Sequence, residues 1–197
     1  VADRRIRRIP LTAKKQLKWS EWEPVEAEYL RRLRGREPLA EVLDANAFPA
    51  LRGSSWDKQA DEFVGARDGS QFGVAMAWVG DTISAMQNGR APRPPGRPWS
   101  AAFDRAEARS PKARTSREVF GDWLSDEVWS LKWAEDYHFA LARTELATRL
   151  QIAQDICARL RASGARADRA AAEAVMMVEL VGESDYWTEI KDRIRVS

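Results

Sequence analysis

The sequence contains one histidine and one cysteine, and each scarcity removes a class of function. A single cysteine, Cys157, cannot close a disulfide within the chain, and its place among apolar residues predicts a small buried side chain. A single histidine, His138, leaves no spare imidazole for a Ser/His/Asp or Cys/His arrangement. Glu135 and His138 have the i, i+3 spacing of a carboxylate-bridged metal site, with Glu145 further along, but such sites need this pattern twice. We therefore expect no catalytic residues, no metal ion and no cofactor.

The sequence also lacks nucleotide-binding motifs and long apolar runs. It contains no GxxxxGK[ST], GxGxxG, CxxC or HExxH pattern. The longest apolar run, Phe72–Val79, is too short to cross a bilayer, and no signal peptide opens the chain. The first residue is valine, which fits either an alternative start codon or a processed end. We expect no membrane partner, no small-molecule substrate, and a location in a reducing cytoplasm or in a virion assembled there.

What the sequence does contain is enough apolar material for a core, together with strongly segregated charge. Its 197 residues are 44% hydrophobic and include nine tryptophans. The net charge of +2 hides blocks: residues 1–18 hold seven Lys/Arg against one acid, residues 90–117 hold eight against two, and residues 118–145 hold seven acids against two bases. Such blocks indicate contacts between oppositely charged surfaces, either with copies of this chain or with a polyanion.

The clearest structural signal is a stretch without proline or glycine, from Ser125 to Ser163. Its apolar residues recur in steps of four and three from Leu146 to Leu160, which is the spacing of one buried helical seam. One unbroken helix would form a rod of about 55 Å, longer than a domain of this size is wide. We expect the rod either to be kinked or to be covered by a neighbouring subunit. The predicted oligomer interface consists of Trp129, Trp133, Leu150 and Leu160.

The N-terminal half is predicted to be irregular, with short helices. Its most apolar stretch, residues 70–88, fits a central strand or a buried helix, and its alanines and methionines favour the helix. Gly73 and Gly80 would let another helix approach closely. Four of the nine prolines lie in residues 89–99, which predicts an extended strap. The predicted fold is all-α in four segments: a basic arm (1–18), a helical core segment (19–88), a Pro/Arg-rich linker or strap (89–115) and a long helix with a helical hairpin (116–197).

Several predicted helices carry signals at their ends. Pro24 suits the first position of a helix ending at Arg34, and Ser54 or Ser55 can cap a helix over residues 56–66. Thr115 and Glu118 fit a capping box, so a helix should start near Ser116. Ser184 is expected to cap the last helix.

The basic segments are candidates for contact with nucleic acid or with an acidic partner. The N-terminal arm has too few apolar residues to fold alone, and a polyanion or another subunit could order it. The predicted contact residues are Arg4, Arg5, Arg7, Arg8, Lys112 and Arg114. A helix-turn-helix over residues 152–177 is a weaker hypothesis, because Arg169 is the only basic residue on the helix that would read base edges.

One resemblance lies in the long helical stretch. The run Ala142-Arg143-Thr144-Glu145-Leu146-Ala147-Thr148 is similar to the A-R-T-E-x-A helix of phage minor head proteins of the Mu F head-morphogenesis type. The tail from Tyr186 to Arg193 is similar to a stretch that follows this helix in the family. Together the two pieces cover about residues 135–195. The resemblance implies a protein at the portal or inside the capsid that touches DNA or scaffold, and it implies no catalysis by Arg143 or Glu145.

These observations favour a non-enzymatic structural or assembly protein that works as a homo-oligomer or with other subunits, such as a phage head or portal component. The alternative is a regulatory protein that binds the phosphate backbone of DNA through its basic arms. A third alternative is an enzyme whose carboxylates gather from distant segments, in which case Glu135 or Glu145 would be needed for a metal-dependent activity.

Overall fold

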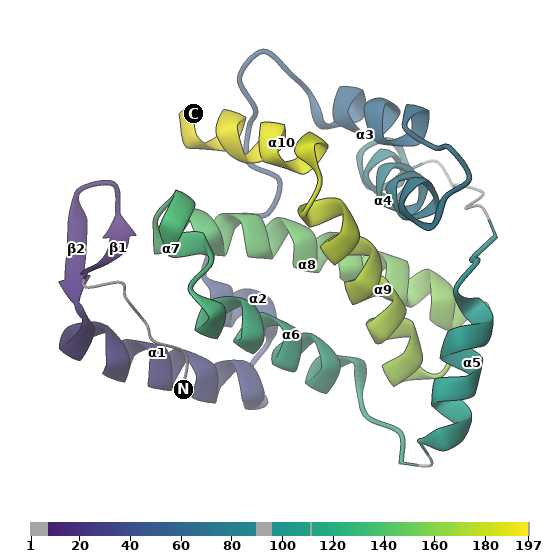
Figure 1. Cartoon of the computed structure of the whole chain (residues 1–197), viewed down its shortest axis with the longest axis horizontal. Helices are drawn as coiled ribbons and strands as arrows, with labels where there is room; N and C mark the ends of the chain where they lie inside the picture. Colours follow the sequence, from purple (N-terminus) through teal and green to yellow (C-terminus); the bar gives the residue numbers. More distant parts are fainter. Residues whose placement is uncertain (1–7, 90–95, 111, 197) are drawn as a thin grey trace. The chain divides into compact units, whose positions relative to one another are not determined.

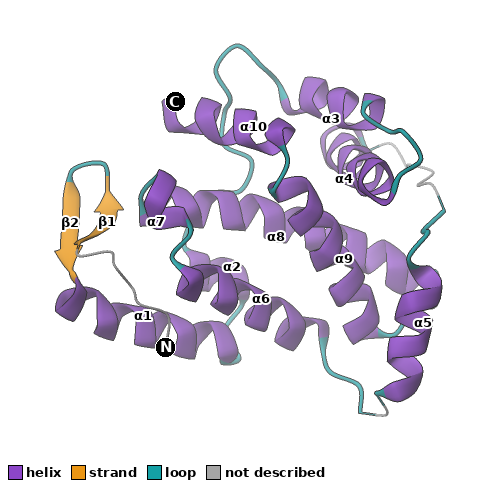
Figure 2. Ribbon diagram, viewed as in Figure 1, coloured by secondary structure: helices purple, strands orange, loops and turns teal. Residues whose placement is uncertain are grey.

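A computed structural model describes residues 8–89, 96–110 and 112–196 of the chain. These residues form mostly helix, as predicted, together with one two-stranded sheet (Figure 2). The chain divides into two compact units, and each unit is built from two separate stretches. Unit 1 comprises residues 1–47 and 121–147, and unit 2 comprises residues 48–120 and 148–197.

Unit 1 begins with a β-hairpin where the sequence predicted an unstructured arm. Strands β1 (Arg8–Thr12) and β2 (Lys15–Lys18) pair antiparallel, and Ile9 lies opposite Leu17. Pro10 is tolerated because both strands are edges of a two-stranded sheet. Burial of Ile9, which is fully enclosed, gives this short hairpin its apolar anchor. The all-α prediction is therefore wrong at residues 8–18.

Helix α1 (Trp19–Arg34) continues directly from the hairpin and contacts both strands and α2 (Leu39–Leu43) (Figure 1). It starts five residues before Pro24, because the backbone NH of Lys18 donates to Glu21 (2.7 Å) and begins the helix there. Its inner side enters an aromatic cluster in which the Trp22 ring lies 5.6 Å from Trp133 and 4.9 Å from Phe139. Edge-to-face contacts of this kind stabilise a core beyond the area that they bury.

Of the two outcomes expected for the stretch over residues 125–163, a kinked rod or a rod covered by a subunit, the structure shows the broken one, because three helices occupy it. They are α6 (Ser116–Ser130), α7 (Trp133–Asp136) and α8 (Phe139–Ala162). The first break is at Leu131, a buried residue with a φ of +57°, and the second is at Tyr137, which is extended. Leaving the helix at Leu131 lets Trp133 enter the aromatic cluster while its indole NH donates to the Val128 carbonyl (3.3 Å). At 24 residues, α8 is about 36 Å long, so a rod no longer argues for a covering subunit.

Unit 2 is a helical core built around residues 70–88, the stretch whose sequence fits either a strand or a buried helix. Residues 71–88 form helix α4 (Gln71–Asn88), which packs along α3 (Trp56–Gly65) and against α9 (Ala167–Gly182) (Figure 1). The predicted close approach occurs at Gly80, where a Cβ atom would lie 2.7 Å from the Ala60 carbonyl oxygen of α3. Helices α5 (Ser100–Arg109) and α10 (Asp185–Val196) both contact α9.

A second glycine in unit 2 makes room for a charged side chain. A Cβ atom on Gly182 would lie 2.7 Å from Nη2 of Arg149. Arg149 is buried, bonds the Glu179 carboxylate and donates to the Val178 carbonyl (3.4 Å). Because Gly182 has no side chain, the guanidinium group of Arg149 has room to pair with Glu179 inside the unit.

The predicted helix ends are mostly confirmed, because their signals are local. The capping box is present: the Thr115 NH donates to Glu118 (2.7 Å), and the Glu118 NH donates to the Thr115 hydroxyl (3.2 Å). Ser55 caps α3 and Ser184 caps α10 through the Trp187 NH (3.2 Å). The proposed strap lies partly outside the described residues, and of the strap only Gly89 and residues 96–99 are described before α5.

Candidate functional site

Exposed cations gather on α5 and on the loop that follows it in unit 2. Arg105 and Arg109 lie on α5, and Lys112 and Arg114 lie on the loop that leads to α6. All four side chains are exposed. Arg105, Arg109 and Lys112 make no ion pair with any residue that the structure describes. We call these four residues the α5 basic surface.

The loop of the α5 basic surface is fixed to the start of α9. Arg166 donates to the Ser110 carbonyl (3.0 Å), and the Asp168 carboxylate accepts the backbone NH of Arg114 (3.1 Å). The Ser116 hydroxyl donates to the Ala167 carbonyl (3.0 Å). Lys112 and Arg114 thus stand on a backbone that is held at both ends, which lowers the ordering cost of binding a ligand there.

Helix α5 itself is attached to α9 through ion pairs between side chains, because none of its own residues is buried. Arg169 of α9 pairs with Asp104 (2.5 Å) and Glu107 (3.3 Å) on α5. Arg169 also pairs with Glu173 (3.0 Å), a fully buried carboxylate. Glu173 in turn accepts from Arg97 (2.6 Å) and from the indole NH of Trp99 (3.1 Å), directly before α5. A buried charge satisfied by three donors is a strong anchor and is costly to disrupt.

These ion pairs leave the solvent-exposed surface of α5 positively charged, because they neutralise its two acids. Asp104 and Glu107 are the only acids of α5, and both are paired with arginines of the α9 end, since Arg166 also approaches Glu107 (3.6 Å). The outward cations of α5 therefore keep their charge without a local counter-ion among the described residues. A surface of this kind attracts phosphate through long-range electrostatics, without reading base sequence.

Asp168 has a shifted pKa at the centre of the loop anchor. Burial raises its pKa, but hydrogen bonds from Arg166 and from the backbone NH groups of Arg114 and Arg169 outweigh burial, so the pKa lies below its ordinary value. Asp168 is therefore ionised at neutral pH and keeps all of these donors.

The hairpin of unit 1 is a second basic element. Arg8, Lys14, Lys15 and Lys18 are exposed, and residues 8–18 contain no acid. Arg8 lies directly opposite Lys18 across the hairpin, so two like charges share one face. None of the four makes an ion pair with a described residue. The other predicted contacts, Arg4, Arg5 and Arg7, lie outside the described residues.

The four residues predicted as an oligomer interface differ sharply in exposure. Trp129 of α6 is 51% exposed, whereas Trp133, Leu150 and Leu160 are 6%, 2% and 1% exposed. The chain's own side chains already cover the last three in this conformation. Trp129 is therefore the one member of the set whose side chain is largely exposed.

The Glu135, His138 and Glu145 hypothesis does not yield a shared site. Glu135 is exposed, the His138 ring accepts the backbone NH of Leu141 (3.2 Å), and buried Glu145 accepts from the Tyr137 hydroxyl. Over the described ranges, no three His, Cys, Asp or Glu side chains gather as a metal site requires.

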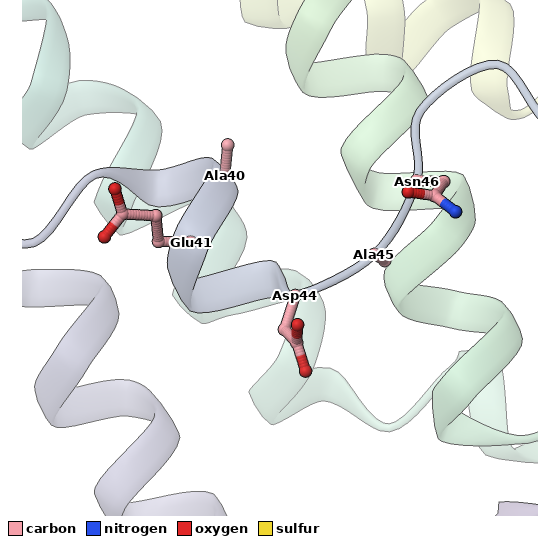
Figure 3. A pocket seen from close by; sticks show the side chains of 5 residues that line it. All are labelled: Ala40, Glu41, Asp44, Ala45 and Asn46. Carbon is pink, nitrogen blue, oxygen red and sulfur yellow. The ribbon is translucent and has the colours of Figure 1, made fainter.

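A polar pocket of about 500 Å³ lies at the end of α2 in unit 1 (Figure 3). Its lining residues are Ala40, Glu41, Asp44, Ala45 and Asn46. Behind it, Arg143 lies 3.6 Å from Asp44, donates to the Leu43 carbonyl (3.2 Å) and stacks on the Phe139 ring. The Leu43 carbonyl also accepts from Tyr29, whose pKa burial raises to about 12. The lining offers carboxylates and an amide with no nucleophile beside a base, so it suggests no reaction.

Comparison with known proteins gives no relative: no family model, curated protein or solved structure matches this chain. In the part of the chain that the structure describes, no helix combines the length and the apolar character that crossing a membrane would need. Function must therefore be argued from the surfaces described above.

Sequence reasoning found half of the α5 basic surface and one residue of the hairpin cluster. It named Lys112, Arg114 and Arg8, and it missed Arg105, Arg109 and the three hairpin lysines. The density of Lys/Arg in residues 1–18 and 90–117 was the available signal. The sequence could not show which of the cations form ion pairs within the fold and which remain exposed.

Proposed function

We propose that this chain is a non-enzymatic structural protein of a nucleic-acid-containing assembly, and that the α5 basic surface rests against the phosphate backbone. The observation that carries the proposal is the distribution of ion pairs: the acids of α5 are paired with arginines of the α9 end, while Arg105, Arg109 and Lys112 make no close ion pair with a described residue. Displacement of condensed counter-ions by such cations drives non-specific binding.

The same geometry argues against sequence-specific reading. Arg169, the only basic residue that a recognition helix over residues 168–180 would offer, is engaged with Asp104, Glu107 and Glu173. A helix without free donors cannot form the bidentate base contacts on which direct readout depends. Binding is therefore proposed to depend on charge and salt and to be indifferent to sequence.

The assembly part of the proposal has different support. The resemblance to phage minor head proteins at residues 142–148 and 186–193 supports a place in a phage head or portal. The exposure of Trp129 fits a protein partner, since tryptophan is enriched at protein interfaces.

The proposal predicts a salt-dependent affinity that can be dissected by substitution. Replacing Arg105, Arg109 and Lys112 by Gln should weaken binding to a random-sequence DNA duplex. It should also reduce the slope of log K against log salt by up to about 2.7, since each lost phosphate contact contributes about 0.9. Fluorescence anisotropy from low to moderate salt measures both quantities.

A matched control is available, because Arg34, Arg36 and Arg52 are also exposed and make no ion pair with described residues. Replacing these three by Gln changes the net charge equally and should leave the slope close to that of the parent chain. Equal slopes for the two triple variants, or no binding of the parent chain at low salt, would contradict the proposal.

A further inference from the structure

The β1–β2 hairpin of unit 1 is anchored through one face and presents cations on the other. Ile9 and Leu17 are cross-strand partners, and Ile9 is fully buried while Leu17 is partly buried. Arg8 and Lys18 form the neighbouring cross-strand pair, so their side chains project from the opposite face, and both are exposed. The outer face of the hairpin therefore carries a pair of cations where the strands meet α1.

The turn of the hairpin carries a second pair of cations. Lys14 and Lys15 are exposed, and the turn is the end of the hairpin that points away from α1 (Figure 2). The Thr12 hydroxyl accepts the backbone NH groups of Lys14 (3.3 Å) and Lys15 (3.1 Å), which fixes the backbone that carries both lysines. At about 3.4 Å per residue, the length of β1 places the two pairs of cations about 14 Å apart.

The composition of the hairpin indicates a phosphate ligand in preference to a protein or a lipid surface. Residues 8–18 contain four cations, no acid and no aromatic residue, and none of the four cations makes an ion pair with a described residue. Protein interfaces are enriched in aromatic side chains, and elements that bind membranes insert large apolar ones. Every exposed side chain of the hairpin is polar, charged or alanine. The pattern fits a polyanion.

The dimensions of the hairpin fit B-form DNA. The major groove is about 12 Å wide and admits a two-stranded ribbon. Because the two pairs of cations lie about 14 Å apart, a hairpin that lies across this groove brings one pair to the phosphates of each strand. The phosphates also offset the repulsion between Arg8 and Lys18, which face each other across the hairpin.

We propose that the hairpin lies across the major groove of B-form DNA, with Arg8 and Lys18 on the phosphates of one strand and Lys14 and Lys15 on the phosphates of the other. The proposal rests on the nucleic-acid part of the proposed function. It adds a second contact, which belongs to unit 1 and is separate from the α5 basic surface of unit 2. This contact responds to charge and to groove width, and it reads no base sequence.

The test uses the full-length chain in which the three α5 cations are already replaced by Gln. In this background, Arg8→Gln with Lys18→Gln should weaken binding to a fluorescent mixed-sequence DNA duplex, and so should Lys14→Gln with Lys15→Gln. Each pair of substitutions should lower the slope of log K against log salt by up to about 1.8, because each removes two phosphate contacts. Fluorescence anisotropy measures both quantities. An unchanged slope for either pair would overturn the proposal.

An RNA duplex of the same sequence tests the role of the groove. A-form RNA has a deep and narrow major groove that a ribbon cannot enter. The background chain should therefore bind the DNA duplex more tightly than the RNA duplex, and this ratio should fall towards one in both hairpin variants. Equal affinity for the two duplexes would overturn the proposal, as would equal competition by polyglutamate, which is a flexible acidic chain without grooves. The ratio is measured on an unaltered hairpin, so it does not depend on how the variants fold.

Controls separate the hairpin contact from a general loss of charge. Arg34→Gln with Arg36→Gln removes as much charge from unit 1, at exposed positions outside the hairpin, and should leave the slope unchanged. Arg8→Lys keeps the charge and should keep the slope, and exchange protection of the Leu17 amide shows whether the hairpin is intact. The α5 contact is judged by a different comparison, between the parent and the background chain. Either contact can therefore fail while the other succeeds.

Discussion

The two basic elements of this molecule present similar charges but are positioned by opposite means. The hairpin is local: β1 and β2 are two residues apart, and fully buried Ile9 anchors them. The α5 basic surface is long-range: its helix buries no residue and is held by Arg166, Arg169 and Glu173, more than fifty positions later in the chain.

The difference teaches that exposed charge has two distinct costs. In the hairpin the cost is direct repulsion, since Arg8 faces Lys18 with no counter-ion in the described chain. At α5 the cost is the desolvation of buried partners, above all Glu173, which three donors offset. The first element should gain stability when a charge is removed, and the second should lose it.

The largest effect is expected from Glu173→Ala. Removing the carboxylate leaves the Arg97 and Arg169 guanidinium groups and the Trp99 indole without their common acceptor, which should cost about 3–5 kcal/mol of unfolding free energy. Urea denaturation measures the loss, and hydrogen exchange should show early opening of α5. The matched control is Glu189→Ala, whose carboxylate is mostly exposed and lies 3.7 Å from Arg193, so it should change stability by less than about 1 kcal/mol. Similar losses in both variants would mean that the network does not hold α5.

A smaller effect should appear as a pH dependence of the loop anchor. Because the pKa of Asp168 is lowered in the folded chain, its contribution is complete above the unfolded value of about 4 and is lost as the pH falls through the folded value. Protection of the Arg114 amide against exchange should therefore decline in acid. Asp168→Asn should remove that decline and cost about 1.5–3 kcal/mol of local stability at neutral pH. A decline that persists in the Asn variant would place the titrating group elsewhere.

The smallest effect has the opposite sign. Arg8→Gln removes one of the two like charges on the hairpin face and should stabilise the hairpin by about 0.2–0.5 kcal/mol at low salt. Exchange of the Leu17 amide reports it, and added salt should shrink the gain. Lys14→Gln, at the turn and without a cross-strand partner, should give less. A destabilised Arg8→Gln hairpin would show that the side chain has a structural role.

Local signals explain why much of the secondary structure was predictable. The alanines and methionines of residues 70–88 favoured the helix that α4 forms, and the Thr115–Glu118 capping box marked the start of α6. Gly80 was suspected of allowing close helix packing, and a Cβ atom there would meet the Ala60 carbonyl. Each of these features depends on residues within about one turn of one another, or on a side chain that is absent.

The failures have long-range causes. Leu131 carries no breaker signal, and its positive φ follows from tertiary packing that draws Trp133 toward Trp22 and Phe139. The hairpin was missed because Pro10 and the sparse apolar residues masked two edge strands. The candidate site was half predicted, because charge density located residues 90–117 but not the pairing of Asp104 and Glu107 with distant arginines.

The space beside Gly182 that the Arg149 side chain occupies has an evolutionary consequence. Any side chain at position 182 would overlap the guanidinium group, whose nearest atom is 2.7 Å from an added Cβ. A single mutation at 182 would thus have to displace a buried ion pair, whereas a prior change of Arg149 to a smaller residue would open the space. The two positions should therefore change together in descendant sequences, because a side chain at position 182 is accommodated at least cost where residue 149 is smaller or its guanidinium group is displaced.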